Sequence, residues 1–305
     1  MSGVRLLLNL CVAAVETDRC TGTRFSTLLS SVCSYKTFPF DKERDYDDED
    51  QNDFLLDLFS HVKDYATQTG RSFLPALQSV FQSPDEWIID LSKRKISVLL
   101  EVLKLQTEKK PVYLICSEEE SDVKSFLQCL QHISQLRFLD MYHEEARMSG
   151  VRLLLNLCVA AVETDRCTGT RFSTLLSSVC SYKTFPFDEE RDGYVVHYQS
   201  DFLLDLCAHV KNYETQTDRS FLPALQSVFQ SPDVWIIDLS KRKISVLLEV
   251  LKLQTEKKPV KLRRCSEEES DVKSFLQCLQ HISRLRAILV GLIISPGVSC
   301  QNGPL

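Results

Sequence analysis

The chain has 305 residues, of which 44% are hydrophobic and 26% charged, as is ordinary for a folded soluble protein. Its net charge of −6 offers no basic footprint for nucleic acid, so we expect no nucleic-acid partner. Twelve cysteines are too sparse for a small disulfide scaffold. The opening apolar run follows only Arg5 and recurs inside the chain, so we expect no signal peptide and a reduced, cytoplasmic location.

The chain consists of two tandem copies of one unit. Residues 1–41 are identical to residues 148–188, and residues 53–111 match residues 201–259 with six substitutions. A period this long predicts a repeat architecture. We therefore divide the sequence into repeat unit one, repeat unit two and a divergent apolar tail, which span residues 1–147, 148–287 and 288–305 respectively.

Each copy begins with a predicted pair of helices. In the second copy, "GVRLLLNLCVAAVETDRCTGTRFSTLLSSVC" is typical of a helix, a Thr-Gly turn and a second helix, with an extended "KTFPF" after it. An acidic run at 41–53 holds eight acids and is predicted to be a solvated loop rather than a calcium site, because it lacks the glycine and distal glutamate of an EF-hand. The run beginning "DFLLDL" repeats the helix, turn, helix pattern.

Strand and helix patterns alternate in the rest of each copy. "WIIDLS" at 235–240 alternates apolar residues as a strand does, and "KISVLLEVLKLQTEKK" has helical apolar spacing. "PVKLRR" is a second strand candidate, and a capping box at Ser266 and Glu269 precedes another helix. "SRLRA" is a third strand candidate. We expect an α/β fold, a helix-rich solenoid with short parallel strands, with an all-α helical repeat as the alternative.

The motif V-x-L-x-x-C at Val260, Leu262 and Cys265 resembles the strand and turn of ribonuclease-inhibitor-like leucine-rich repeats. The words "LLSSVCSYKTFPF" and "SFLQCLQHIS" are similar to the divergent repeats of vertebrate NLR proteins, cytosolic innate-immune receptors. The resemblance implies a leucine-rich-repeat solenoid with a role in innate-immune sensing or its regulation. No glycine precedes a lysine in this chain, so the phosphate loop of the NACHT domain is missing from it.

Neither the cysteines nor the histidines have the spacing of a site. The closest cysteine pairs, at 11 and 20 and at 158 and 167, are too far apart for a zinc motif. Cys116, Cys129, Cys265 and Cys278 fall at apolar or turn positions, where a thiol packs as a small hydrophobe. No serine lies in G-x-S-x-G and no H-E-x-x-H occurs. We expect no enzymatic activity, no metal and no cofactor.

Binding to other proteins is the function that the pattern favours. Residues between the buried positions of the strands face the other side of a sheet, and several differences between the copies fall there. The predicted protein-binding concave face consists of Asp90, Tyr113, Arg137, Asp238, Lys261 and Arg286.

The expected function is a non-enzymatic protein-interaction scaffold of leucine-rich-repeat type. The alternatives are an all-helical repeat adaptor and, with less support, a nucleotide-dependent switch or a hydrolase. The apolar part of the tail is too short to span a membrane, so we expect no membrane span. Exposed apolar sequence favours association, so self-association through the tail is a further expectation.

Overall fold

A computed structural model describes residues 2–40, 48–91, 95–115, 123–139, 141–187, 196–238, 244–264 and 269–287. Helices hold 64% of these residues. The chain forms two compact units, an N-terminal unit of Met1–Pro232 and a C-terminal unit of Asp233–Leu305. This division is not the division of the sequence into copies, because the N-terminal unit contains the first copy together with the helical part of the second.

The first copy begins with two helical pairs. They are α1 (Ser2–Thr21) with α2 (Phe25–Cys33) and α3 (Asp48–Thr69) with α4 (Leu74–Phe81). Gly22 ends α1 in the left-handed conformation, with φ 70°. The carboxylate of Asp18 then accepts hydrogen bonds from the backbone amides of Phe25 and Ser26, at 2.7 and 2.9 Å. One aspartate near the end of α1 therefore holds the start of α2.

The segment between α2 and the acidic run was expected to be extended, but it forms a turn. The side-chain amide of Gln51, on α3, donates to the carbonyl oxygens of Lys36 and Phe38 at 2.7 and 2.9 Å. The second copy has the same arrangement, in which Gln199 donates to Lys183 and Phe185 at the same two distances. A buried glutamine thus fixes this turn in both copies.

Strands follow the helical pairs. The elements are β1 (Trp87–Asp90), α5 (Ile96–Leu103), β2 (Lys110–Ile115), α6 (Val123–Phe126), the 3₁₀-helix η2 (Leu127–His132) and β3 (Ile133–Phe138). The strands form a parallel sheet in the order β1-β2-β3. Trp87, Val112 and Leu136 lie side by side across it and are fully buried. Alternate residues point to the other side of the sheet.

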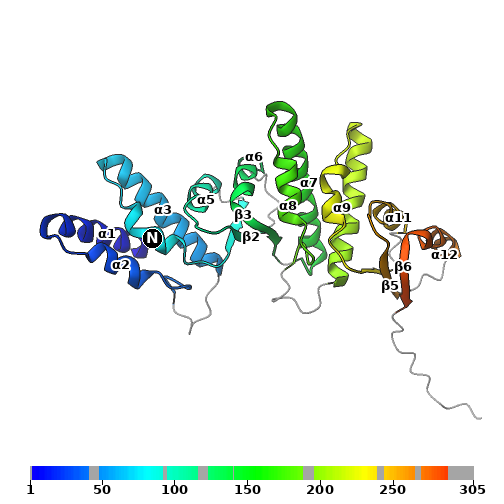
Figure 1. Ribbon diagram of the computed structural model, residues 1–305, viewed down its shortest axis with the longest axis horizontal. Helices are drawn as coiled ribbons and strands as arrows, with labels where there is room; N and C mark the ends of the chain where they lie inside the picture. The colour runs from blue at the N-terminus through cyan, green and yellow to red at the C-terminus, as the bar shows by residue number, and fades with distance from the viewer. Residues whose placement is uncertain are drawn as a thin grey trace, which may run out of the picture. The chain divides into compact units, whose positions relative to one another are not determined.

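The second copy continues the N-terminal unit with four helices. They are α7 (Glu144–Thr168), α8 (Phe172–Cys180), α9 (Val196–Thr217) and α10 (Leu222–Phe229). In Figure 1, α7 and α8 lie beside β3, and they pack on the end of the first copy. Arg147, on α7, forms a buried ion pair with Asp205, on α9, with Nε and Oδ2 3.2 Å apart. The start of the second copy is therefore anchored to the end of the first.

The C-terminal unit repeats the strand pattern. It contains β4 (Trp235–Asp238), α11 (Ile244–Lys252), β5 (Lys258–Arg264), α12 (Glu269–Leu276), the 3₁₀-helix η4 (Leu279–His281) and β6 (Ile282–Ala287). Its sheet is parallel, in the order β4-β5-β6. Figure 1 shows β5 and β6 side by side, with α11 and α12 nearby.

The expected continuous leucine-rich-repeat solenoid is wrong. The six strands belong to two separate three-stranded sheets, and α7 to α10 lie between them in the chain. The physical reason is that α7 to α10 pack on one another while α8 also packs against the edge strand β3, so the next strand in the chain, β4, belongs to a separate sheet. The helix-rich alternative is nearer to the structure, although the predicted strands form parallel ladders and are not mere helix connections. The capping serine Ser266 and Cys116 and Cys265 lie outside the described residues, as does the tail.

Candidate functional site

The sheet register brings the predicted face residues together in pairs. Tyr113 on β2 lies opposite Arg137 on β3, and Lys261 on β5 lies opposite Arg286 on β6. Both pairs point away from the buried tryptophan side of their sheet, as strand alternation predicted. We call this side of each sheet its outer face.

In the first sheet the outer face is occupied. Tyr113 is only 2% exposed, so it is not available to a partner, contrary to its place on the predicted binding face. Arg137 donates to the hydroxyl of Tyr113 at 2.5 Å and to the amide oxygen of Gln135 at 2.7 Å. The ring of Tyr182, after α8, lies 5.9 Å from the same guanidinium. The second copy therefore covers part of this face.

The outer face of the second sheet is open. A hollow of about 460 Å³ lies on it, lined by Val234, Pro259, Lys261, Ser283, Arg284 and Arg286. Arg286 is exposed and Lys261 half-buried. Among the residues that the structure describes, none forms an ion pair with these three cations. Within the described part of the chain, the hollow therefore presents three positive charges without an acidic partner.

The two copies differ in charge at this hollow. Lys261 stands where the first copy has Tyr113, Arg284 where it has Gln135, and Val234 where it has Glu86. Each of these substitutions makes the second face more positive by one unit. Arg284 and Val234 were absent from the predicted site. The difference in charge between the two copies at these positions could have identified them from the sequence.

The two predicted aspartates lie at the ends of their strands. Asp90 pairs in register with Ile115 on β2, and Asp238 with Arg264 on β5. Both are half-buried, and neither lines the hollow. They therefore belong to the outer faces but not to the cationic cluster.

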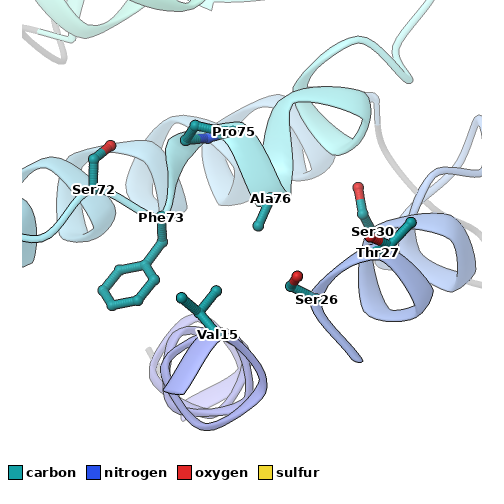
Figure 2. Close-up of a pocket in the computed structure, with 8 residues that line it drawn as sticks. All are labelled: Val15, Ser26, Thr27, Ser30, Ser72, Phe73, Pro75 and Ala76. Atoms are coloured by element: carbon teal, nitrogen blue, oxygen red, sulfur yellow. The ribbon is translucent and has the colours of Figure 1, made fainter. Parts of the chain in front are cut away.

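A second hollow, of about 390 Å³, lies between α1, α2 and α4 (Figure 2). Figure 2 shows Val15 and Phe73 lying toward each other, with the hydroxyls of α2 on the other wall. Ser26 donates to Asp18 at 2.6 Å, and Ser30 shares a hydrogen bond with Ser79. Neither a histidine nor an acid is among the residues that line this hollow, and the carboxylate bonded to Ser26 also holds the start of α2.

Most of the cysteines that the structure describes are buried as packing residues, whereas Cys20 and Cys167 are exposed. Cys129 and Cys278 are fully buried, as predicted. Burial raises the pKa of Cys129 to about 12 and that of Cys278 to about 11, so neither thiol is readily ionised. Within the described ranges, no group of three or more His, Cys, Asp or Glu residues is arranged to hold a metal ion.

The described helices include none with the length and hydropathy that a membrane span requires. No family model, no curated protein and no solved structure matches this chain.

Proposed function

We propose that this protein is a non-enzymatic binding module that recognises an acidic segment of a partner protein on the outer face of its second sheet. The observation that carries the proposal is the open hollow with Lys261, Arg284 and Arg286 in its lining. Guanidinium groups favour carboxylates because they bind both oxygens at once. The resemblance to NLR proteins remains an expectation from the sequence and does not enter this argument.

Charge and size favour a protein segment over nucleic acid. Three cations around a hollow of about 460 Å³ match a few carboxylates, whereas the protein as a whole carries a net charge of −6. A nucleic acid would be repelled by that overall charge and normally requires a longer basic stripe. A short acidic peptide needs only the local cluster.

The test is fluorescence anisotropy with a labelled peptide rich in Asp and Glu. We expect saturable binding that weakens as salt is added, because charges at a surface are screened. Replacing Lys261→Glu and Arg284→Glu together should weaken it by about tenfold or more. Arg286 is left unchanged in this variant.

The matched control reverses two exposed cations of the N-terminal unit, Arg19→Glu and Lys63→Glu. It changes the net charge equally and should leave peptide binding unchanged. Equal losses in both double variants would show a non-specific charge effect and contradict the proposal. Preferential binding of a single-stranded oligonucleotide of the same charge, or of a labelled nucleotide, would also contradict it.

A further inference from the structure

At the junction between the two copies inside the N-terminal unit, backbone groups of the edge strand β3 receive hydrogen-bond partners from the second copy. The hydroxyl of Tyr182 donates to the carbonyl oxygen of Leu136 at 2.9 Å, and the amide of Phe138 donates to the carbonyl oxygen of Pro186 at 3.2 Å. An edge strand presents unpaired backbone groups that need such partners. The turn after α8 therefore closes the first sheet.

Apolar side chains from both copies are buried at this junction. On the first copy, Leu127, Leu130 and Leu136 are at most 1% exposed, where η2 and β3 meet α8. On the second copy, Leu153 and Val179 are 8% and 5% exposed. The internal junction is thus a packed apolar contact with two hydrogen bonds to backbone groups of β3 at its edge.

The residues equivalent to both sides of this junction are exposed elsewhere in the protein. Leu276, Leu279 and Leu285 correspond to the three buried leucines of the first copy and are 58%, 42% and 44% exposed. We call these three residues, with strand β6, the C-terminal edge. At the other end of the chain, the N-terminal face consists of Leu6, Leu10, Phe25, Leu28, Val32 and Tyr35, whose exposed fractions range from 45% to 67%.

Each exposed surface has the sequence of a surface that is covered. Residues 1–41 repeat 148–188 without a change, and residues 272–287 repeat 123–138 with two changes. Leu6, which is 62% exposed, is equivalent to the buried Leu153, and Val32, which is 67% exposed, is equivalent to the buried Val179. The internal junction therefore shows that the N-terminal face and the C-terminal edge have sequences that fit each other.

The turn after α2, beside the N-terminal face, already has the conformation that the equivalent turn after α8 has at the internal junction. Gln51 holds the turn after α2 by the same two hydrogen bonds, at the same distances, as Gln199 holds the turn after α8. Thr37 also donates to the carbonyl oxygen of Phe40 at 3.1 Å, as Thr184 does to that of Phe187. Little ordering is needed before contact, which favours association.

We propose that the protein associates head to tail with a second copy of itself, the N-terminal face of one molecule docking on the C-terminal edge of another. The contact repeats the internal junction: Tyr35 of one molecule donates to the carbonyl oxygen of Leu285 of the other, with its ring beside Arg286. Such an interface is heterologous, so it produces chains of molecules or closed rings. The proposal does not depend on the acidic ligand, since it needs neither Lys261 nor Arg284.

One of the two changes weakens the intermolecular contact. In the internal junction, the ring of Phe138 lies 6.1 Å from that of Phe185 and 6.0 Å from that of Phe202. The equivalent position on β6 is Ala287. Because aromatic pairs add to the free energy of contact, we expect Ala287→Phe to tighten association by about three- to tenfold.

The test measures the mass of the complete chain by sedimentation over about 1 to 100 μM, the range expected for an interface of modest strength. Wild-type protein should grow in mass with concentration. Val32→Asp blocks the N-terminal face and Leu276→Asp blocks the C-terminal edge, and each should weaken association by roughly 10- to 100-fold. Thr27→Asp is the matched control, because Thr27 lines the hollow between α1, α2 and α4 and its equivalent Thr174 stays exposed at the internal junction.

Mixing the two blocked variants gives the sharpest result. Each keeps one intact surface, so the mixture should form a one-to-one dimer and nothing larger, with circular dichroism confirming that both variants are folded. Wild-type protein that stays monomeric throughout the range would overturn the proposal. Association that survives both substitutions, or a mixture that stays monomeric, would overturn it as well.

Discussion

At the scale of single residues, two equivalent aspartates connect neighbouring helices. Asp18 binds the start of α2, and Asp165 binds the start of α8 through the amides of Phe172 and Ser173, at 2.7 and 2.9 Å. Partial burial raises the pKa of Asp18, but hydrogen bonds from Ser26, Thr23 and Phe25 outweigh this effect and lower the pKa to about 2. The pKa of Asp165 is lowered by the equivalent bonds.

These pKa shifts predict a loss of stability in acid. A carboxylate whose pKa is lower in the folded state stabilises the fold above its ordinary pKa of 3.8, and that stabilisation is lost as pH falls towards about 2. We expect the melting temperature of the wild type to fall over this interval. The double variant Asp18→Asn and Asp165→Asn should melt lower at neutral pH and show a smaller fall. Melting followed by circular dichroism at several pH values checks this, and an unchanged fall would contradict it.

At the scale of elements, the two copies of one helix are capped differently. Before α10, the carboxylate of Glu214 accepts hydrogen bonds from the amide of Leu222, at 2.8 Å, and from that of Phe221. The first copy has Ala66 at the equivalent position, so α4 lacks this cap. The same eight-residue helix therefore occurs twice in one protein, once with a carboxylate bound at its start and once without.

The two helices form a natural matched pair for mutation. Glu214→Ala should lower the free energy of unfolding by about 1 kcal/mol, as is usual for the loss of a side-chain cap. Ala66→Glu should raise it by up to about 1 kcal/mol, because it creates the missing acceptor before α4. Urea denaturation followed by circular dichroism measures both changes. Stability that falls in both variants would show that the carboxylate does not act as a cap.

At the scale of the whole molecule, burial separates two classes of cysteine. Cys11, Cys129, Cys158 and Cys278 are at most 1% exposed, whereas Cys20 and Cys167, near the ends of α1 and α7, are exposed. Burial, together with a smaller effect of Cys33 on the first thiol and of Glu214 on the second, raises the pKa of Cys11 and of Cys158 to about 12. The thiolate is the reactive species, so buried thiols react slowly.

Among the nine cysteines that the structure describes, we therefore expect iodoacetamide at about pH 8, near the ordinary pKa of a thiol, to label Cys20 and Cys167 first. The seven described cysteines that are buried should follow only after unfolding in urea. Peptide mass spectrometry resolves the sites, and the variant Cys20→Ser with Cys167→Ser is the control that removes fast labelling of the described cysteines. Rapid labelling of Cys129 or Cys278 in the native protein would contradict the burial described here.

Periodicity predicted local structure well where one face of an element is apolar. Alternation in "WIID" corresponds to β4, and helical spacing in "ISVLLEVLK" corresponds to α11. It did not predict how far each sheet extends, because the pattern of one strand does not show whether the next helix returns to that sheet or packs on another helix. The leucine-rich-repeat solenoid was wrong for this reason.

The sequence by itself determined the two copies, most helices and strands, and the side of each strand on which Lys261 and Arg286 lie, because these features depend on residue identity and local periodicity. Only the tertiary structure decided that Tyr113 is buried while Lys261 is half-buried and lines a hollow. Identical sequence segments, such as those in α1 and α7, differ in burial because a neighbouring copy covers the segment in α7 and not the segment in α1. Burial depends on that neighbour, and no residue carries this information alone.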